Sequence, residues 1–162
     1  CRCCRAEGMS PLDGPKPRVK FWELPLESLS AQEWELLCDH CGRCCLKKLE
    51  DEDTGEIAWT RVICRYHERE SGRCGCYPER TVKVPECMDV RQMSLADARW
   101  MPATCAYRLR FEGKPLPQWH PLLTGSNTAL QHAEIQVDER ALSEEYVHPM
   151  GYHEHVIRWV DS

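Results

Sequence analysis

The segment that decides how this chain folds is Cys38-Asp39-His40-Cys41-Gly42-Arg43-Cys44-Cys45. A thiol recurs here at every third residue, so one tight turn or helical end can direct three sulfur atoms to a common centre while a distant cysteine supplies a fourth. This spacing indicates metal ligands rather than a packing pattern. Successive side chains diverge on a helix or a strand, so Cys45 is not expected to share an ion with Cys44. A second metal centre or a bridging thiolate is therefore expected.

Cysteines further along the chain complete the predicted ligand set. The glycine in Cys74-Gly75-Cys76 lets the backbone fold closely around one ion. The predicted metal ligands are Cys38, Cys41, Cys44, Cys45, Cys64, Cys74, Cys76, Cys87 and Cys105. Nine sulfur atoms suit two four-thiolate sites with one spare, or three ions with some bridging sulfurs. For Cys64 and Cys105, burial as a small hydrophobic residue is an equal alternative.

The same spacing leaves the metal open between zinc and iron. Zinc usually takes two separated Cys-x2-Cys pairs, whereas a Cys-x2-Cys-x2-Cys run with a remote fourth cysteine is also how iron–sulfur clusters are held. Leu46 stands where ferredoxin-type runs often have proline, which removes the slight preference for iron. The expected cofactor is thus zinc or iron, as a mononuclear ion or an iron–sulfur cluster.

Histidines and basic residues close to the cysteines are secondary candidates. His40 and His67 can serve as nitrogen ligands, although nine thiols leave little need for them. Four thiolates around a divalent ion leave excess negative charge. The residues expected to offset this charge, or else to form a solvated basic face, are Arg43, Lys47, Lys48, Arg61 and Arg65.

Composition explains why metal is needed. The chain has 162 residues, about one domain, but Leu, Val, Ile and Phe together number only 30. Metal bound to thiolates adds on the order of 10 kcal/mol to the folded state, comparable to the net stability of a domain. The cysteines are therefore expected to be structural at least.

Charge and hydropathy exclude several partners. The formal net charge of −5 disfavours binding to nucleic acid or to an anionic membrane, and no run of about 18 apolar residues is present to span a membrane. A secreted disulfide protein is the alternative explanation for so many cysteines. The absence of a secretory signal and the adjacent Cys44 and Cys45 argue against it and favour a reducing cytoplasm.

The N-terminal segment is expected to stand apart. Met9 resembles a natural start, so residues 1–8 and their Cys1, Cys3 and Cys4 are interpreted as extraneous. Residues 1–18 are predicted to be disordered or extraneous, and residues 19–162 to form a single cysteine-cluster domain.

Local patterns predict a small α+β fold, stapled by metal, with short helices, a β-hairpin and long irregular loops that carry cysteines. Ser30-Ala31-Gln32-Glu33 has the form of a capping box, which would start a helix with Trp34 and Leu37 in the core and Cys38 at its end. The other expected elements are a hairpin of 47–52 and 56–62, a loop over 65–90, helices starting at 94 and over 103–112, an extended stretch over 114–126, a helical turn at 127–132 and a strand at 134–138. The tail from 141 to 162 is ambiguous.

Together, several stretches of the chain resemble a known family. The segment 38–45, the later cysteines, Pro102-Ala103-Thr104-Cys105-Ala106-Tyr107-Arg108 and Trp119-His120-Pro121-Leu122-Leu123-Thr124-Gly125-Ser126 resemble the YcgN-like branch of the bacterial CxxCxxCC (YkgJ-type) cysteine-cluster family. The resemblance covers most of residues 21–137. It implies chelation of zinc or iron with no established reaction, and it implies that all nine cysteines above are metal-site candidates.

The sequence supports three kinds of function. A metal-binding protein whose thiolate cluster organises the fold comes first, followed by an iron–sulfur redox protein or enzyme component, and then by metal storage or sensing. Whether the chain is an enzyme stays open, since no nucleophile triad, phosphate-binding loop or His-Glu-x2-His pattern occurs. An unknown protein partner is considered for the 119–126 loop, although packing by Trp119 and Leu122 is the favoured explanation of that loop. His148, His153 and His155 are expected to be solvated.

Overall fold

The computed structural model describes residues 16–94 and 96–160. The helices are α1 Ala31–Leu37, α2 Arg80–Lys83, α3 Ala106–Phe111, α4 Pro121–Thr124 and α5 Thr128–His132, and the strands are β1 Leu46–Glu50, β2 Ile57–Ile63, β3 His67–Glu68, β4 Arg73–Cys74 and β5 Leu142–Ser143. Single 3-10 turns and one longer 3-10 helix lie between them, at Phe21–Glu23, Leu26–Ser28, Arg43–Cys45, Tyr77–Glu79, Asp97–Trp100, Glu144–Tyr146 and Pro149–His155. The predicted small α+β class is confirmed. The expectations for residues 1–15, with Cys1, Cys3 and Cys4, lie outside the described residues.

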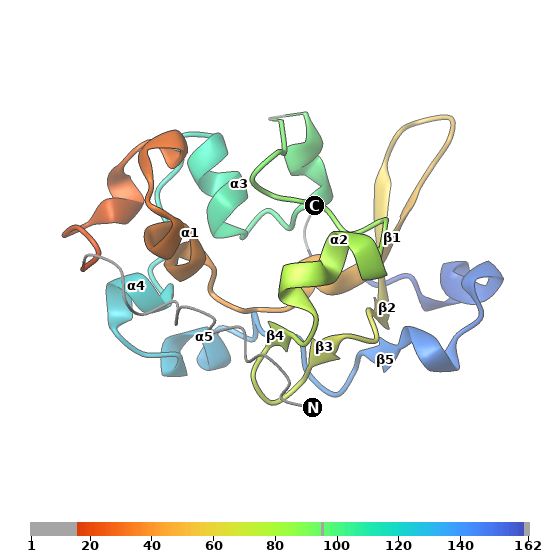
Figure 1. The fold of residues 1–162 in the computed structure, drawn as a ribbon. Coiled ribbons are helices and arrows are strands. Elements are labelled where there is room, and N and C mark those ends of the chain that lie inside the picture. The colour runs from red at the N-terminus through yellow and green to blue at the C-terminus, as the bar shows by residue number, and fades with distance from the viewer. Residues whose placement is uncertain (1–15, 95, 161–162) are drawn as a thin grey trace, which may run out of the picture.

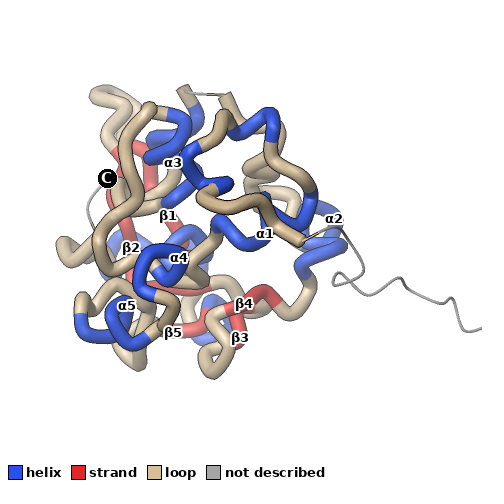
Figure 2. The backbone as a smooth tube through the Cα atoms, turned by 90° about the vertical axis from the view of Figure 1, so that its left-hand side faces the viewer, coloured by secondary structure: helices blue, strands red, loops and turns tan. Residues whose placement is uncertain are grey.

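Helices and strands gather on different sides of the molecule. In Figure 1, α1, α3, α4 and α5 lie on one side and the β1–β2 hairpin lies on the other. Figure 2 shows that long loops connect these short elements, as predicted. The described residues contain no helix that is both long enough and apolar enough to span a membrane.

Helix α1 begins at the predicted capping box. The Glu33 backbone N–H donates to Ser30 Oγ at 3.2 Å, and the Ser30 N–H donates back to Glu33 Oε2 at 2.9 Å. The Glu33 carboxylate is also held by Arg18, whose Nε donates to Oε1 at 2.8 Å. Trp34 and Leu37 are buried, as expected, and the helix ends before Cys38, which is extended.

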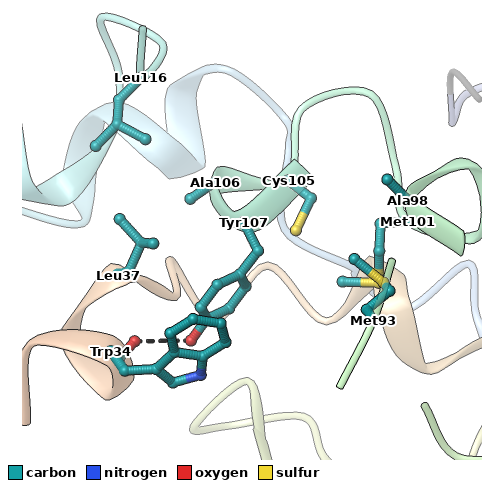
Figure 3. Packing of buried hydrophobic residues seen from close by; sticks show 9 residues of the cluster. All are labelled: Trp34, Leu37, Met93, Ala98, Met101, Cys105, Ala106, Tyr107 and Leu116. Carbon is teal, nitrogen blue, oxygen red and sulfur yellow. Dashed lines mark hydrogen bonds between the residues drawn. The ribbon is translucent and has the colours of Figure 1, made fainter. Parts of the chain in front are cut away.

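A first core, here called the helical core, packs under these helices. Its buried members are Trp34, Leu37, Met93, Ala98, Met101, Cys105, Ala106, Tyr107 and Leu116 (Figure 3). The Tyr107 hydroxyl donates to the Trp34 carbonyl at 2.8 Å, and the two rings lie 4.8 Å apart between centroids. The hydroxyl is therefore satisfied inside the core, which a buried tyrosine requires.

A second core, here called the sheet core, lies under the hairpin. It consists of Leu46, Trp59, Ile63, Val137, Ala141 and Val160. Strands β1 and β2 pair antiparallel, with Leu46 opposite Ile63 and a register irregularity before the pair of Lys48 and Trp59. This confirms the predicted hairpin. Strand β5, which was not predicted, pairs parallel to the end of β2 and gives the order β1-β2-β5.

Some local predictions were wrong. Residues 134–138 form no strand, because their backbone is used to hold the cysteine segment instead. The loop at 65–90 contains β3, β4 and α2, which are too short to show periodicity in the sequence. Helix α3 begins at 106 rather than 103, since Cys105 is extended and occupies the N-cap, and α4 forms one turn within the stretch at 114–126 that was expected to be extended.

Replacement of Glu33 should change how stability depends on pH. The Arg18 side chain holds the pKa of Glu33 well below its ordinary value of 4.5. A lowered folded-state pKa stabilises the native chain above that ordinary value and ceases to do so as the pH falls below it. We expect the Glu33→Gln variant, compared with the parent at equal metal content, to be less stable at pH 7, with the difference in unfolding free energy shrinking steadily below about pH 4.5. Urea denaturation at several pH values measures this, and a pH-independent difference would contradict it.

Candidate metal centre

The cysteine segment is a tightly turned crossing between the two cores. In Figure 1 the chain leaves α1 and runs across to β1 through this segment. His40 and Gly42 both have left-handed backbone conformations, with φ of 56° and 75°. The Cys41 N–H donates to Asp39 Oδ1 at 3.0 Å, and the Cys45 N–H donates to the Gly42 carbonyl at 3.0 Å. These turns fix the backbone that carries the thiols of this segment.

Residues 134–137 hold the crossing in place. Arg43, which is buried, donates from Nε to the Ile135 carbonyl at 2.6 Å and from its terminal nitrogen to the Glu134 carbonyl at 3.0 Å. The Val137 N–H donates to the Cys41 carbonyl at 2.8 Å. A segment almost a hundred residues away thus fixes the cysteine backbone.

Gly42 lies against the ring of His67. A Cβ atom at position 42 would fall closer to His67 Nε2 than real Cβ contacts allow. Both ring nitrogens of His67 are buried, and neither forms a hydrogen bond with any described residue. Burial also lowers the pKa of His67, so its ring is neutral and keeps a lone pair for a cation.

One set of thiols, here called the helical thiol group, consists of Cys38, Cys41, Cys44 and Cys105. Cys105 belongs to the helical core, and Cys38 packs against it. The sulfurs lie close enough that charge on Cys38 and Cys44 raises the pKa of Cys41, and charge on Cys44 raises that of Cys105. Burial is the larger cause: it raises the pKa of Cys38 and Cys41 far above the usual range, and that of Cys105 to about 12.

The remaining cysteines, Cys45, Cys64, Cys74, Cys76 and Cys87, form the sheet thiol group. The sulfurs of Cys74 and Cys76 are 3.7 Å apart. The Cys64 N–H donates to the Cys45 carbonyl at 3.0 Å. Burial raises the pKa of Cys76 to about 11, helped by the neighbouring Cys74, and burial raises that of Cys87, with further contributions from nearby thiolates.

Cys44 and Cys45 join the two groups. A hydrogen bond between their thiols lowers the pKa of Cys44 and raises that of Cys45. Lys48 donates from Nζ to the Cys44 carbonyl at 2.9 Å, and its ammonium lies 4.7 Å from the centre of the Trp59 ring. This places a cation at the junction of the groups.

Only some of the predicted basic residues lie near the thiols in the structure. Lys47 and Lys48 lie near thiols, whereas Arg61 bonds to His155 and Arg65 bonds to Glu144. Arg80 and Lys83, which were not predicted, lie near Cys87 and Cys76 respectively. Both stand on or beside α2, an element that the sequence did not reveal.

The thiols are neighbours but not yet a coordination shell. All nine cysteines in the described part of the chain are free thiols, without disulfides. Across residues 16–94 and 96–160, no three side chains of His, Cys, Asp or Glu converge closely enough to hold one ion as they stand. Coordination of one ion would therefore require the sulfurs within a group to lie closer together than they do here.

The other histidines of the sequence analysis have ordinary roles. His120 is fully buried, with Nε2 3.2 Å from the Leu37 carbonyl and Nδ1 accepting from the Leu122 N–H, so it supports the end of α1. His148 and His153 are exposed. His40 is half-buried, which lowers its pKa. Partner binding by the 119–126 loop stays a prediction.

Asp39 is the residue that the sequence analysis missed. It is 6% exposed, and its Oδ2 atom is buried without a hydrogen-bond partner among the described residues. A carboxylate between the first two cysteines of the segment was the available signal.

A Gly42→Ala substitution should destabilise the protein through two separate effects. The left-handed backbone costs a residue with a Cβ atom about 1–2 kcal/mol, and the clash with His67 adds to this cost. We expect Gly42→Ala to cost less in a His67→Ala background, because only the backbone effect then remains. Urea denaturation of the four proteins gives the coupling energy, and the same cost in both backgrounds would contradict the contact.

Comparison with known proteins identifies the family. Residues 37–106 match the CxxCxxCC family model, described as a "putative zinc- or iron-chelating domain". The chain is 48% identical to a UPF0260 protein of Rhodobacter capsulatus over 141 residues, which cover 86% of this chain and 95% of that one. It is 42% identical to a UPF0260 protein of Marinobacter nauticus over 144 residues, which cover 88% and 97%. No solved structure matches the chain. The chain therefore belongs to the CxxCxxCC family, among its UPF0260 relatives.

Proposed function

We propose that this protein chelates zinc or iron through its two thiol groups and that the bound metal fastens the helical core to the sheet core. The observation that carries the proposal is the gathering of thiols from five separate stretches of chain around the two ends of one crossing segment. A chain that needed cysteine only as a small apolar residue would have no reason to gather thiols from distant segments there.

The energetics of the thiols support a cation. Each buried thiol resists losing its proton, because its thiolate would stand in an apolar environment near other thiolates. A divalent ion that replaces the protons removes this penalty and takes the sulfur atoms as soft ligands. Lys48, Arg80 and Lys83 supply positive charge to balance the surplus on the sheet thiol group.

The proposal has two alternatives. An iron–sulfur redox protein or enzyme component is supported by Cys44, which is exposed and so gives a cluster a path to an external electron donor. Metal storage or sensing is the second alternative. A reducing cytoplasm suits all three, because free thiols persist there.

Removal of metal should unfold the protein. We expect a strong competing chelator to abolish the far-ultraviolet circular dichroism of anaerobically purified protein, because thiolate-bound metal contributes on the order of 10 kcal/mol, as much as a small domain's net stability. Elemental analysis and a visible spectrum of the same sample identify the metal. Colourless protein with zinc would exclude the redox alternative, and a chain that stays folded after losing its metal would instead favour storage or sensing.

Single serine substitutions should show whether the two groups are separate centres. We expect Cys41→Ser and Cys76→Ser each to remove the metal of one group and leave that of the other, which elemental analysis measures. A Cys1→Ser, Cys3→Ser, Cys4→Ser variant is the matched control and should keep its full metal content. Loss of all metal from either single variant would indicate one shared cluster instead.

A further inference from the structure

A buried carboxylate with an unsatisfied oxygen stands inside the helical thiol group. Asp39 lies between Cys38 and Cys41 in sequence and is 6% exposed. Its Oδ1 atom accepts from the Cys41 N–H at 3.0 Å, while its buried Oδ2 atom accepts from no described residue. Burying a carboxylate oxygen without a partner costs several kcal/mol by the usual estimate for polar groups. Such a group in a native structure needs an explanation.

Asp39 is flanked in the chain by Cys38 and Cys41, while Arg69 and Arg73 line the same polar hollow as Asp39. The Cys41 N–H donates to the Asp39 carboxylate at 3.0 Å, and the His40 N–H donates to the Cys38 sulfur at 3.4 Å. The Asp39 carboxylate therefore lies in the same turn as Cys38 and Cys41. Two thiols and a carboxylate in one turn are donors of the kind that a thiolate-binding metal ion takes.

Asp39 also has access to solvent. It lines a polar hollow of about 370 Å³, together with His40, Arg73, Leu130 and Gln131 among others. Cys38 and Cys41 do not line this hollow, so Asp39 is the member of the donor set that borders it. The hollow therefore gives Asp39, rather than the thiols themselves, a side that faces solvent.

We propose that Asp39 supplies a carboxylate oxygen ligand to the metal ion bound by the helical thiol group. This inference rests on the proposed metal-binding function and deepens it. Aspartate oxygen is a common ligand of both zinc and iron, and one oxygen donor distinguishes this centre from an all-sulfur centre. The two thiol groups then differ in chemistry, with the mixed centre on the helical side.

Asparagine separates this role from the structural role of Asp39. An amide oxygen in Asp39→Asn can still accept from the Cys41 N–H and so preserve the turn, but the amide is neutral and a much poorer ligand. Asp51 offers the matched control. Its Oδ1 accepts from the Thr54 N–H at 2.8 Å in the hairpin turn, in an exposed position. Asp51→Asn is therefore the same substitution in a similar turn without thiol neighbours.

The test loads the full chain anaerobically with cobalt(II) as a spectroscopic probe. Sulfur-to-cobalt charge-transfer intensity counts thiolate ligands, and the ligand-field bands report whether an oxygen is among them. We expect Asp39→Asn to keep the charge-transfer intensity, to shift the ligand-field bands and to weaken cobalt binding at the affected centre at least tenfold. Asp51→Asn should match the parent, and Asp39→Glu should restore part of the affinity.

Each outcome bears on a distinct claim. A parent that takes up no cobalt would overturn the proposed function and this inference with it. A parent that binds cobalt, with bands and affinity the same in Asp39→Asn as in Asp51→Asn, would overturn the inference alone. If Asp39→Asn fails to fold, the unmodified parent loaded with cadmium-113 decides: a resonance at the position of mixed sulfur and oxygen coordination supports Asp39, and only all-sulfur resonances overturn it.

Discussion

The burial of ionisable thiols at the crossing between two cores is the constraint on which this structure depends. Eight residues carry the chain from α1 to β1, and their sulfurs face both sides. Buried thiols stay protonated unless a cation replaces the proton, and protonated thiols attract one another only weakly. Hydrogen bonds therefore hold the crossing, such as those from the Arg43 side chain to the Ile135 carbonyl and from the Val137 N–H to the Cys41 carbonyl.

Apolar packing within two such small cores contributes little to holding the helical core and the sheet core in place relative to one another. The helical core and the sheet core share no buried member, and each is built on elements of only a few residues. Burial of apolar area scales with core size, so two small cores gain less than one large core of the same composition. Under the proposed function, metal bound by ligands from both cores would add stability between them.

The sequence predicted those parts of the fold whose causes are local. The capping box at Ser30 and Glu33 and the hairpin around Gly55 depend on neighbours within a few residues, and both are observed. Strand β5 has only two residues and owes its conformation to β2, so no pattern within it could reveal it. The expected strand at 134–138 does not form, because its backbone groups bond to Arg43 and Cys41 instead of to another strand. These distant contacts could not be seen in the local sequence pattern.

The same distinction between local and distant causes explains which features of the candidate metal site could be predicted from the sequence. Spacing nominated the nine cysteines, but it did not assign them to groups, because the assignment depends on where β4, α2 and α3 place Cys74, Cys87 and Cys105. Asp39 was missed because an aspartate in a turn usually has a sufficient role in accepting a backbone N–H, as its Oδ1 does. Only its burial sets the other oxygen apart, and burial is a tertiary property.

Cys44 and Cys45 are adjacent in the chain but belong to different thiol groups. The geometry of one candidate centre therefore affects the geometry of the other. Cys44 and Cys45 share one 3-10 turn, Arg43–Cys45, whose entry is fixed by Gly42 and whose exit is the start of β1. Movement of the Cys44 sulfur toward Cys38 and Cys41 rotates this turn and so moves the Cys45 sulfur relative to Cys64. A short turn of this kind has few alternative conformations, so occupancy of one group restricts the geometry open to the other.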